Sequence, residues 1–187
     1  MLVCFGDESG APVRCNSMHM SILCFERVPG LASIKHGSDL ARELRRVLGL
    51  TRIRELKYRV VRKRLCEGVP LPTILRLFQE RVAAWICVSI HVSNPSSARV
   101  ELLRESVRAL STVARGNEVS MLVLDVQSVR DPRRVFAELR ALGREVGIYI
   151  HRVEMKSSAS VDGIQLADVL VGLCRDGLAP SARRYGR

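Results

Sequence analysis

MLVCFGDESG, the stretch Met1–Gly10, contains the short apolar run LVCF, which is followed at once by Gly6, Asp7 and Glu8. A short apolar run bounded by a turn signal predicts a strand that is buried on both faces. An open α/β sheet usually carries its chemistry at the carboxyl ends of its central strands. Asp7 stands at such an end, although a surface turn in which Asp7 or Ser9 bonds its own backbone would explain the same residues.

The pattern beyond this stretch predicts a mixed sheet. Met18–Phe25 is strand-like and would form a hairpin with the first strand. Further strands are expected at Trp85–Val92, Val119–Leu124 and Ile148–Val153. The alternation of strand and helix in the last third of the chain predicts right-handed crossovers and parallel pairing.

Helices are expected where apolar residues recur at helical spacing between caps and prolines. They run from an N-cap at Ser38 to Gly49, from about Thr51 to Leu65, from Pro70 to Val82, from Pro95 to Gly116, from an N-cap at Asp131 to about Gly143 and from about Asp162 to Cys174. The basic tail, Ser181–Arg187, is expected to be loose. We therefore expect a single α/β domain over residues 1–187, with a basic helical insertion at about 31–84.

The chain is strongly basic, with a net charge of +11 and a pI of about 10.1. Ten basic residues and only two acidic ones stand between Arg42 and Arg64. A solvated helix face usually mixes both signs, so this one-sided charge favours a surface that binds the phosphates of a nucleic acid over general charging for solubility. The residues proposed to contact nucleic acid in this region are Arg52, Lys57, Arg59, Arg62 and Lys63.

Composition also excludes several classes of protein. No apolar run is long enough for a membrane span, and no basic segment precedes a long apolar stretch as in a signal peptide, so the cytoplasm is expected. No C-x-x-C pair supports a zinc site, and Cys4, Cys24, Cys87 and Cys174 lie in apolar runs as small core residues. Few amides among many arginines is a composition reported for hyperthermophiles, and such a source would allow an intracellular disulfide.

The last expected helix reads DGIQLADVLVGLC. Asp162 and Gln165, three residues apart, fit a capping box, which is a sufficient structural reason for both. Asp168 lies well inside the helix among apolar residues, where a helix that is apolar on all sides is buried. A buried aspartate needs a metal or a partner, and the alternative to a metal is an arginine such as Arg152 or Arg175.

Three aspartates could form one cluster. Asp125 ends an apolar strand in the same way as Asp7, and the two carboxylates would emerge side by side if these strands are parallel neighbours. Asp168, on the helix after the next strand, would complete the cluster. Close carboxylates repel one another, and Mg²⁺ or Mn²⁺, which prefer oxygen ligands, would remove that repulsion. Asp7, Asp125 and Asp168 are therefore the predicted metal ligands.

Two motifs, DESG at Asp7–Gly10 and GIQLADVLVG at Gly163–Gly172, resemble those of the domain of unknown function family 3800. Glu55-Leu56-Lys57 is similar to that family's Glu-x-Lys, and Lys156-Ser157-Ser158 is similar to its lysine loop. Glu154-Met155 departs from the Asp-Ser that often precedes that lysine. The resemblance covers essentially the whole chain and implies a ribonuclease-H-like sheet with acidic residues on its first strand, its fourth strand and its last helix.

The resemblance also implies a further carboxylate. In the superfamily it usually lies on the helix after the third strand, where this chain has Glu101 and Glu105, whereas the family motif points to Glu55. Glu55 is preferred here, and the alternative is an ordinary exposed Glu55–Arg59 pair on a helix. Glu8 is expected on the opposite side of the strand from Asp7, by alternation.

These residues favour a divalent-metal-dependent nuclease or phosphodiester-processing enzyme. Asp7, Asp125 and Asp168 would bind the ions, Glu55 would be a fourth ligand or would position water, and the basic helices with Lys156 would hold the nucleic-acid backbone. The alternative is a catalytically inactive protein of the same fold that binds nucleic acid or a partner, because fold does not dictate function. The substrate (DNA, RNA, hybrid or junction) and the oligomeric state stay open.

Overall fold

The computed structural model describes residues 1–10, 16–51, 55–114, 118–125 and 131–184. One sheet with the strand order β5-β4-β1-β2-β3-β6 runs through it. Its strands are β1 (Leu2–Ser9), β2 (Ser17–Glu26), β3 (Ala84–His91), β4 (Val119–Asp125), β5 (Val153–Lys156) and β6 (Ala182–Arg184). The helices are η1 (Ser33–Lys35), α1 (Ser38–Val47), α2 (Tyr58–Cys66), α3 (Leu71–Arg81), α4 (Ala98–Val113), α5 (Pro132–Glu145), η3 (Ser158–Ser160) and α6 (Asp162–Arg175).

The sheet is mixed, as the sequence predicts. β1 pairs antiparallel with β2 and parallel with β4, and β4 pairs parallel with β5. β3 is antiparallel to both β2 and β6. β1 lies in the middle of the sheet, between β4 and β2, and its apolar run is therefore buried on both faces. The carboxyl ends of β1, β4 and β5 consequently meet at one end of the sheet.

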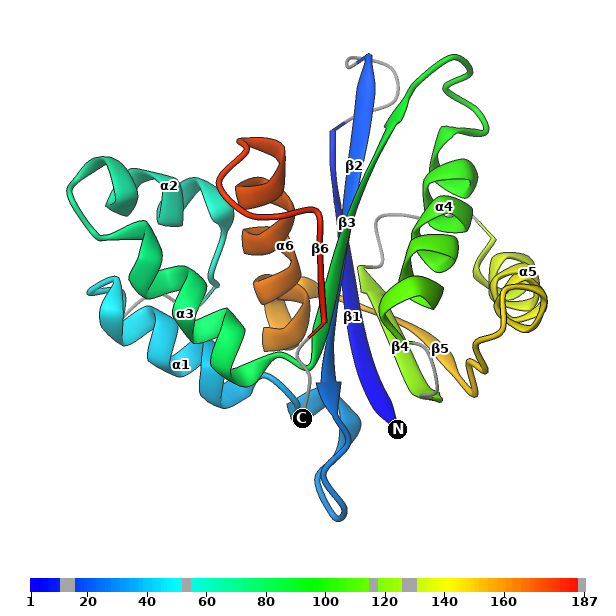
Figure 1. Cartoon of the computed structure of the whole chain (residues 1–187), viewed down its shortest axis with the longest axis horizontal. Coiled ribbons are helices and arrows are strands. Elements are labelled where there is room, and N and C mark those ends of the chain that lie inside the picture. Colours follow the sequence, from blue (N-terminus) through cyan, green and yellow to red (C-terminus); the bar gives the residue numbers. More distant parts are fainter. Residues whose placement is uncertain (11–15, 52–54, 115–117, 126–130, 185–187) are drawn as a thin grey trace.

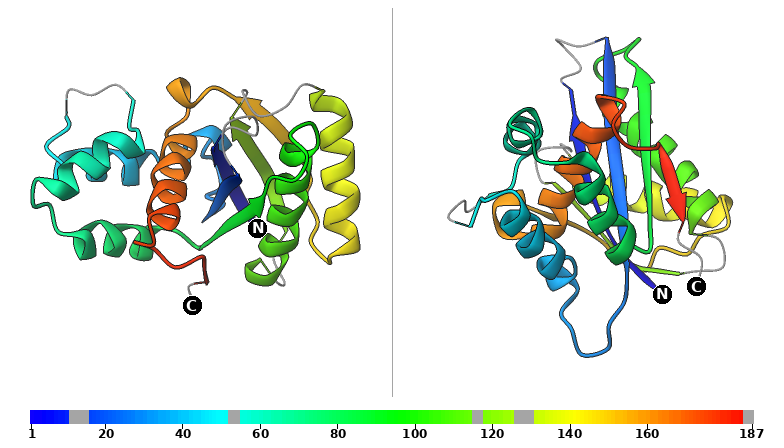
Figure 2. Two further views of the ribbon diagram at one scale, coloured as in Figure 1. Left: turned by 90° about the horizontal axis from the view of Figure 1, so that it is seen from above. Right: turned by 60° about the vertical axis from the view of Figure 1, so that its left-hand side comes forward.

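Helices cover both faces of the sheet (Figures 1 and 2). α1, α2, α3 and α6 lie on one face, here called the α6 face, and α4 and α5 lie on the other, here called the α4 face. The alternation along β1 sends Phe5 into the core of the α6 face and Cys4 into the core of the α4 face. α6 packs directly on β1 and β2, and most of its side chains are buried.

One expected helix is shorter than the sequence suggests. The spacing of apolar residues predicts a helix from about Thr51, but α2 begins at Tyr58, and Lys57 before it is extended, with φ −122° and ψ 144°. The reason is tertiary. The backbone N–H of Leu56 donates to Gln165 at 2.7 Å and that of Tyr58 donates to Asp168 at 2.6 Å. These bonds to α6 hold the described residues 55–57 away from helical geometry.

Three further expectations differ from the structure. The strand expected at Ile148–Val153 is observed at Val153–Lys156, because residues 148–150 pack under α5 and pair with β4 only through a bridge at Ile150. Gly37, with φ 85°, is the N-cap of α1 in place of Ser38, and a Cβ there would lie 2.9 Å from the Phe25 ring. The tail expected to be loose contains β6, which pairs with β3.

Four of the expected core cysteines form two disulfides. Cys4–Cys24 joins the paired strands β1 and β2, and Cys87–Cys174 joins β3 to α6. The cysteines are buried or half-buried as expected, but sequence spacing alone could not show which of them would pair. Within the described ranges, no helix combines the length and apolar character that crossing a membrane requires.

Candidate active site

Asp7 and Asp125 lie side by side at the carboxyl ends of two neighbouring parallel strands. Gly6 of β1 is in register with Leu124 of β4, so the two aspartates follow at the same level of the sheet. Both aspartates are buried, and each is only 7% exposed. Phe5 and Val123, two residues earlier, both face the α6 side, and alternation therefore directs both carboxyl groups to that side.

The environment of Asp7 disfavours its charged form. Burial is the main cause that raises its pKa from 3.8 to about 8, and the negative charges of Asp168 and Asp125 raise it further. The backbone N–H of Glu8, which donates to Asp7 at 2.9 Å, and the ammonium of Lys57 act in the opposite direction. The charges of Asp168 and Asp125, the other two aspartates predicted for the cluster, thus both act on Asp7.

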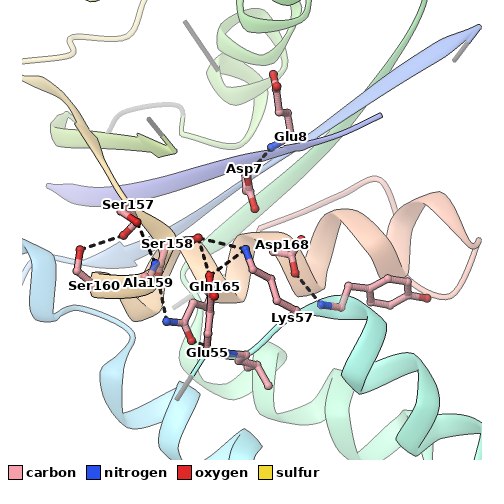
Figure 3. A network of polar contacts seen from close by, with 12 residues as sticks. Asp7, Glu8, Glu55, Lys57, Ser157, Ser158, Ala159, Ser160, Gln165 and Asp168 are labelled. Carbon is pink, nitrogen blue, oxygen red and sulfur yellow. Dashed lines mark hydrogen bonds and ion pairs between the residues drawn. The ribbon is translucent and has the colours of Figure 1, made fainter. Parts of the chain in front are cut away.

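Helix α6 brings Asp168 to this end of the sheet. Ser21 of β2, in register with Asp7, donates to the carbonyl of Ala167 at 2.8 Å, which ties the helix to the strand at this level. Close approach is achieved at Gly163, where a Cβ would lie 2.4 Å from the Phe5 ring. Figure 3 shows Asp7 pointing from β1 toward α6, where Asp168 lies.

Asp168 is half-buried, and its polar partner is a backbone amide. Tyr58 N–H donates to its Oδ2 at 2.6 Å. Burial raises its pKa, while this hydrogen bond and the charges of Lys57 and Arg175 lower it. The arginines considered as its partners bind elsewhere, since Arg152 pairs with Glu154 and Arg175 with Asp176.

Glu55, Lys57 and Ser158 form a polar group beside the aspartates (Figure 3). Lys57 Nζ lies 3.0 Å from Glu55 Oε1 and 3.1 Å from Ser158 Oγ, and Ser158 Oγ donates to Glu55 Oε1 at 2.8 Å. The Ser158 hydrogen bond is the main cause that lowers the pKa of Glu55. Burial alone would lower the pKa of Lys57, but Glu55, Asp168 and Asp7 raise it overall.

Gln165 connects this polar group to α6. Its Oε1 accepts from Leu56 N at 2.7 Å and from Arg45 Nη2 at 2.6 Å, and its Nε2 donates to Ser158 O at 2.8 Å. Asp162 binds Arg45 at 2.8 Å. The capping box predicted for Asp162 and Gln165 is therefore wrong: the N-cap of α6 is Val161, without a side-chain cap. The long-range bonds to Arg45 and residues 55–57 replace it.

The other carboxylates considered in the sequence analysis lie outside this group. Glu101 and Glu105 are on α4, which covers the opposite face of the sheet, and Glu105 pairs with Arg108. Glu8 pairs with Arg99 of α4 at 2.9 Å, so the expected alternation with Asp7 is confirmed. Burial raises the pKa of Glu8, and Arg99 opposes this effect.

A cleft of about 460 Å³ opens beside Asp168 and contains several of the predicted basic residues. Lys57, Arg59 and Arg62 line it, as do Glu55, Tyr58 and Arg175. Basic side chains thus line a cleft that lies directly beside an acidic group.

The remaining basic residues are distributed differently. Lys63 points to the outer side of α2, where it pairs with Glu67 at 3.7 Å. Lys156 of β5 is in register with Asp125 and lies 3.6 Å from Glu154. Arg52 lies outside the described residues.

The fit of a divalent cation can be judged from these side chains. Their donor chemistry suits Mg²⁺ or Mn²⁺, because the cluster offers carboxylate oxygens whose mutual repulsion a cation would relieve. No three carboxylate, histidine or cysteine side chains within the described ranges are arranged to hold an ion together. Mg²⁺ commonly binds through one or two carboxylates and keeps several waters. A site of that kind needs fewer carboxylates than the three aspartates predicted together.

Sequence patterns do not identify two contributors to the site. Ser158 stands out only as part of the lysine loop, and the spacing of Gln165 from Asp162 predicts a cap. The signal that could have identified Gln165 is its position one turn before Asp168 (i, i+3), on the same side of α6. The Tyr58 contribution is a backbone N–H, which almost any residue type would supply, so no sequence pattern predicts it.

Comparison with known proteins identifies the fold. No family model and no curated protein matches the chain, so the resemblance to family 3800 is unconfirmed. Ribonuclease H2 from Pyrococcus horikoshii OT3 matches with a TM-score of 0.55 and 17% identity, over 95% of this chain and 73% of that chain. Ribonuclease HII from Archaeoglobus fulgidus, solved in complex with PCNA, matches with a TM-score of 0.55 and 12% identity, over 95% and 74%. The chain thus has a ribonuclease-H-like fold.

Proposed function

We propose that the chain is a divalent-metal-dependent nuclease. The observation that carries this proposal is the buried Asp7 carboxyl group, whose pKa of about 8 reflects burial and the charges of Asp168 and Asp125. Burying a carboxyl group next to other carboxylates destabilises the fold. Carboxylates with strongly perturbed pKa values beside a cleft are typical of functional sites. The ribonuclease-H-like fold and the net charge of +11 support a nucleic acid as the substrate.

The residues of the chain would divide the work as follows. Asp7, with Asp125 or Asp168, would hold Mg²⁺ or Mn²⁺, and a bound ion of this kind activates water and stabilises charge on the phosphate. Arg59 and Arg62 in the cleft would bind phosphate oxygens on the strand. Lys57, fixed by Glu55 and Ser158, would place one positive charge between the cleft and the aspartates.

Cleavage assays test this proposal. The protein is incubated with Mn²⁺ or Mg²⁺ and with labelled DNA, RNA, RNA/DNA hybrid and branched junction. Asp7→Asn and Asp168→Asn are expected to reduce cleavage to background. Asp39→Asn is the matched control, because it makes the same chemical change at a side chain that is 82% exposed on α1, and it should retain full activity.

Binding of Mn²⁺, measured by calorimetry, supplies a second readout that is independent of turnover. Wild type and Asp39→Asn should bind the ion, and Asp7→Asn should bind it more weakly. Equal cleavage in the wild type and in both site variants would contradict the proposal, as would the absence of Mn²⁺ binding by the wild type.

A second candidate function is metal-independent binding of nucleic acid. It is favoured by Lys57, whose ammonium already provides a positive charge that favours the ionised forms of Asp7 and Asp168. This candidate predicts salt-sensitive binding in the presence of a chelator and no product with any of the four substrates. The Asp7→Asn variant would then bind nucleic acid as tightly as the wild type at neutral pH, because binding would need no metal ion and Asp7, with a pKa of about 8, is already protonated there.

A further inference from the structure

A second cavity lies at the outer edge of the sheet, away from the candidate active site. It has a volume of about 300 Å³ and is lined by Ala137, Arg140, Arg144, Tyr149, Ile150 and His151. The first three residues belong to α5 and the others to the segment that leads into β5. The function proposed above uses none of them.

The two arginines of this cavity are free to bind a ligand, as far as the described residues are concerned. Arg140 and Arg144 are exposed on successive turns of one side of α5, four residues apart, so both guanidinium groups can serve one ligand. Within the described residues neither makes an ion pair or a side-chain hydrogen bond, whereas Arg134 on the same helix pairs with Glu138 at 3.1 Å. Planar guanidinium groups bind phosphate oxygens in a bidentate manner.

An exposed aromatic ring completes the cavity. Tyr149 is 52% exposed, one of the few large apolar side chains at the surface of the described residues. Its ring meets that of His151 edge to face, with 4.5 Å between centroids. His151 is in turn held by Glu118 at 2.8 Å. The Tyr149 ring is thereby supported along one side and leaves area free for a base to stack on.

The helix and the segment that form the cavity pack closely against each other. At Gly143 a Cβ would lie 3.1 Å from the carbonyl oxygen of Ile148, so α5 approaches this segment closely. Ile150 is buried and bridges to Val119 of β4, and His151 N–H donates to the Val119 carbonyl at 2.9 Å. The backbone segments that carry the arginines and the aromatic ring are therefore in direct contact.

From these observations we infer that the Arg140–Arg144–Tyr149 cavity binds one nucleotide unit of a single-stranded nucleic acid. Two guanidinium groups would take the phosphate, and the Tyr149 ring would stack on the base. A base inside a duplex has no free face, so pairing must be absent at this position. The volume lies at the lower end of small-molecule sites, which begin at about 300 Å³, and suits a single nucleotide.

The site is separate from the candidate active site. Val119 marks one end of β4 and Asp125 the other, a span of roughly 20 Å at the usual rise of a strand. A strand that contacts both would have to pass around the β5 edge of the sheet. The inference goes beyond the proposed function and does not depend on it, because binding here needs neither the aspartates nor a cation.

Fluorescence anisotropy with labelled oligothymidylate in the presence of EDTA tests the inference without cleavage. Arg140→Gln/Arg144→Gln should weaken binding about tenfold and reduce the dependence on salt. Tyr149→Ala should also weaken it about tenfold, whereas Tyr149→Phe, which keeps the ring, should bind as wild type. Lys35→Gln/Arg76→Gln removes two exposed positive charges elsewhere and is the matched control, with wild-type affinity expected.

Photocrosslinking locates the contact. Oligonucleotides that carry iodouracil should crosslink to Tyr149 or His151, and this adduct should persist in Arg59→Gln/Arg62→Gln, which alters only the other cleft. Unchanged affinity in the double arginine variant and in Tyr149→Ala, or crosslinks confined to the active-site cleft, would overturn the inference. Thermal melting confirms that each variant is folded. A failure of Mn²⁺-dependent cleavage would leave these results unaffected, so the two proposals fail separately.

Discussion

Asp7 and Glu8 are successive residues of β1, but their carboxyl groups face opposite sides of the sheet and therefore have different surroundings. Alternation along β1 turns Asp7 toward α6 and the other aspartates, and turns Glu8 toward α4, where Arg99 binds it. Both groups are buried enough for their pKa values to rise, but only Asp7 faces a cluster of like charges. The stability of the fold therefore depends on the protonation of this residue.

The pH dependence of Asp7 has a definite sign. Its pKa is about 8 in the folded chain against 3.8 for the ordinary group. Between these values the folded state holds a proton that the unfolded state has released, so the free energy of unfolding decreases as pH rises through this window, and the decrease ends above it. We expect Asp7→Asn to be more stable than the wild type near pH 8. Its free energy of unfolding should also decrease less steeply as pH rises.

Urea unfolding with EDTA, from about pH 5 to about pH 8, measures this difference. Asp39→Asn should follow the wild-type curve, because its carboxyl group is exposed. Parallel curves for the wild type and Asp7→Asn would show that Asp7 titrates as an ordinary carboxyl group.

At the scale of elements, α6 organises the candidate site. It carries Asp168, and through Gln165 it also holds residues 55–57 in the extended form that begins α2. Sequence reasoning predicted α6 from its apolar character but predicted a helix for residues 55–57. Local spacing favours that helix, and only bonds to a helix more than a hundred residues later override it.

Gln165→Leu tests this connection. The substitution leaves Leu56 N–H without its buried partner and removes one hydrogen bond each from Arg45 and from Ser158 C=O, which keeps only the long bond from Val161 N–H. A buried group left unpaired costs about 1–3 kcal/mol. We expect a loss of roughly 2–4 kcal/mol in the free energy of unfolding, measured with urea. Gln79→Leu on α3, a half-buried glutamine without a side-chain hydrogen bond to any of the described residues, is the control and should change stability little.

Gly172 tests the contact between α6 and α2. A Cβ there would lie 2.0 Å from Cγ of Tyr58, so Gly172→Ala must displace the residue whose N–H binds Asp168. Overpacking of this kind costs roughly 1–3 kcal/mol, although alanine is the better helix former by about 1 kcal/mol. In a Tyr58→Ala background, the same substitution should be neutral or stabilising. An equal loss in both backgrounds would place the clash elsewhere.

At the scale of the whole molecule, the two disulfides connect distant parts of the chain. Cys87–Cys174 closes a loop with a sequence separation of 87 between β3 and the helix that bears Asp168. On the chain-entropy model, a loop of that length contributes roughly 4.6 kcal/mol. Cys174→Ser should therefore lower the melting temperature clearly under non-reducing conditions. Cys66→Ser, at an exposed free cysteine, should leave it unchanged, and equal melting of the two variants would contradict the bridge.

The fold is largely predictable because its central strands are short runs of apolar residues, which are easily recognised in the sequence. LVCF and SMLVL predicted buried strands, and the aspartates that follow them predicted which end of the sheet carries the charge. The disulfide partners, the extended form of residues 55–57 and the Gln165 bonds depend on contacts between segments far apart in sequence. No local pattern encodes them. The roles of Asp7, Asp125, Asp168 and Glu55 in catalysis stay predictions.

The parallel pairing of β1 with β4 also has a consequence for the order in which the molecule assembles. β1, β2 and β3 can pair as soon as the first half of the chain is available, but Asp7 meets Asp125 only after α4 has been traversed, and Asp168 arrives later still. Such long-range closure is slow. The positively charged helices α1 and α2 precede it in sequence. A nascent chain therefore acquires its attraction for polyanions before the carboxylates come together.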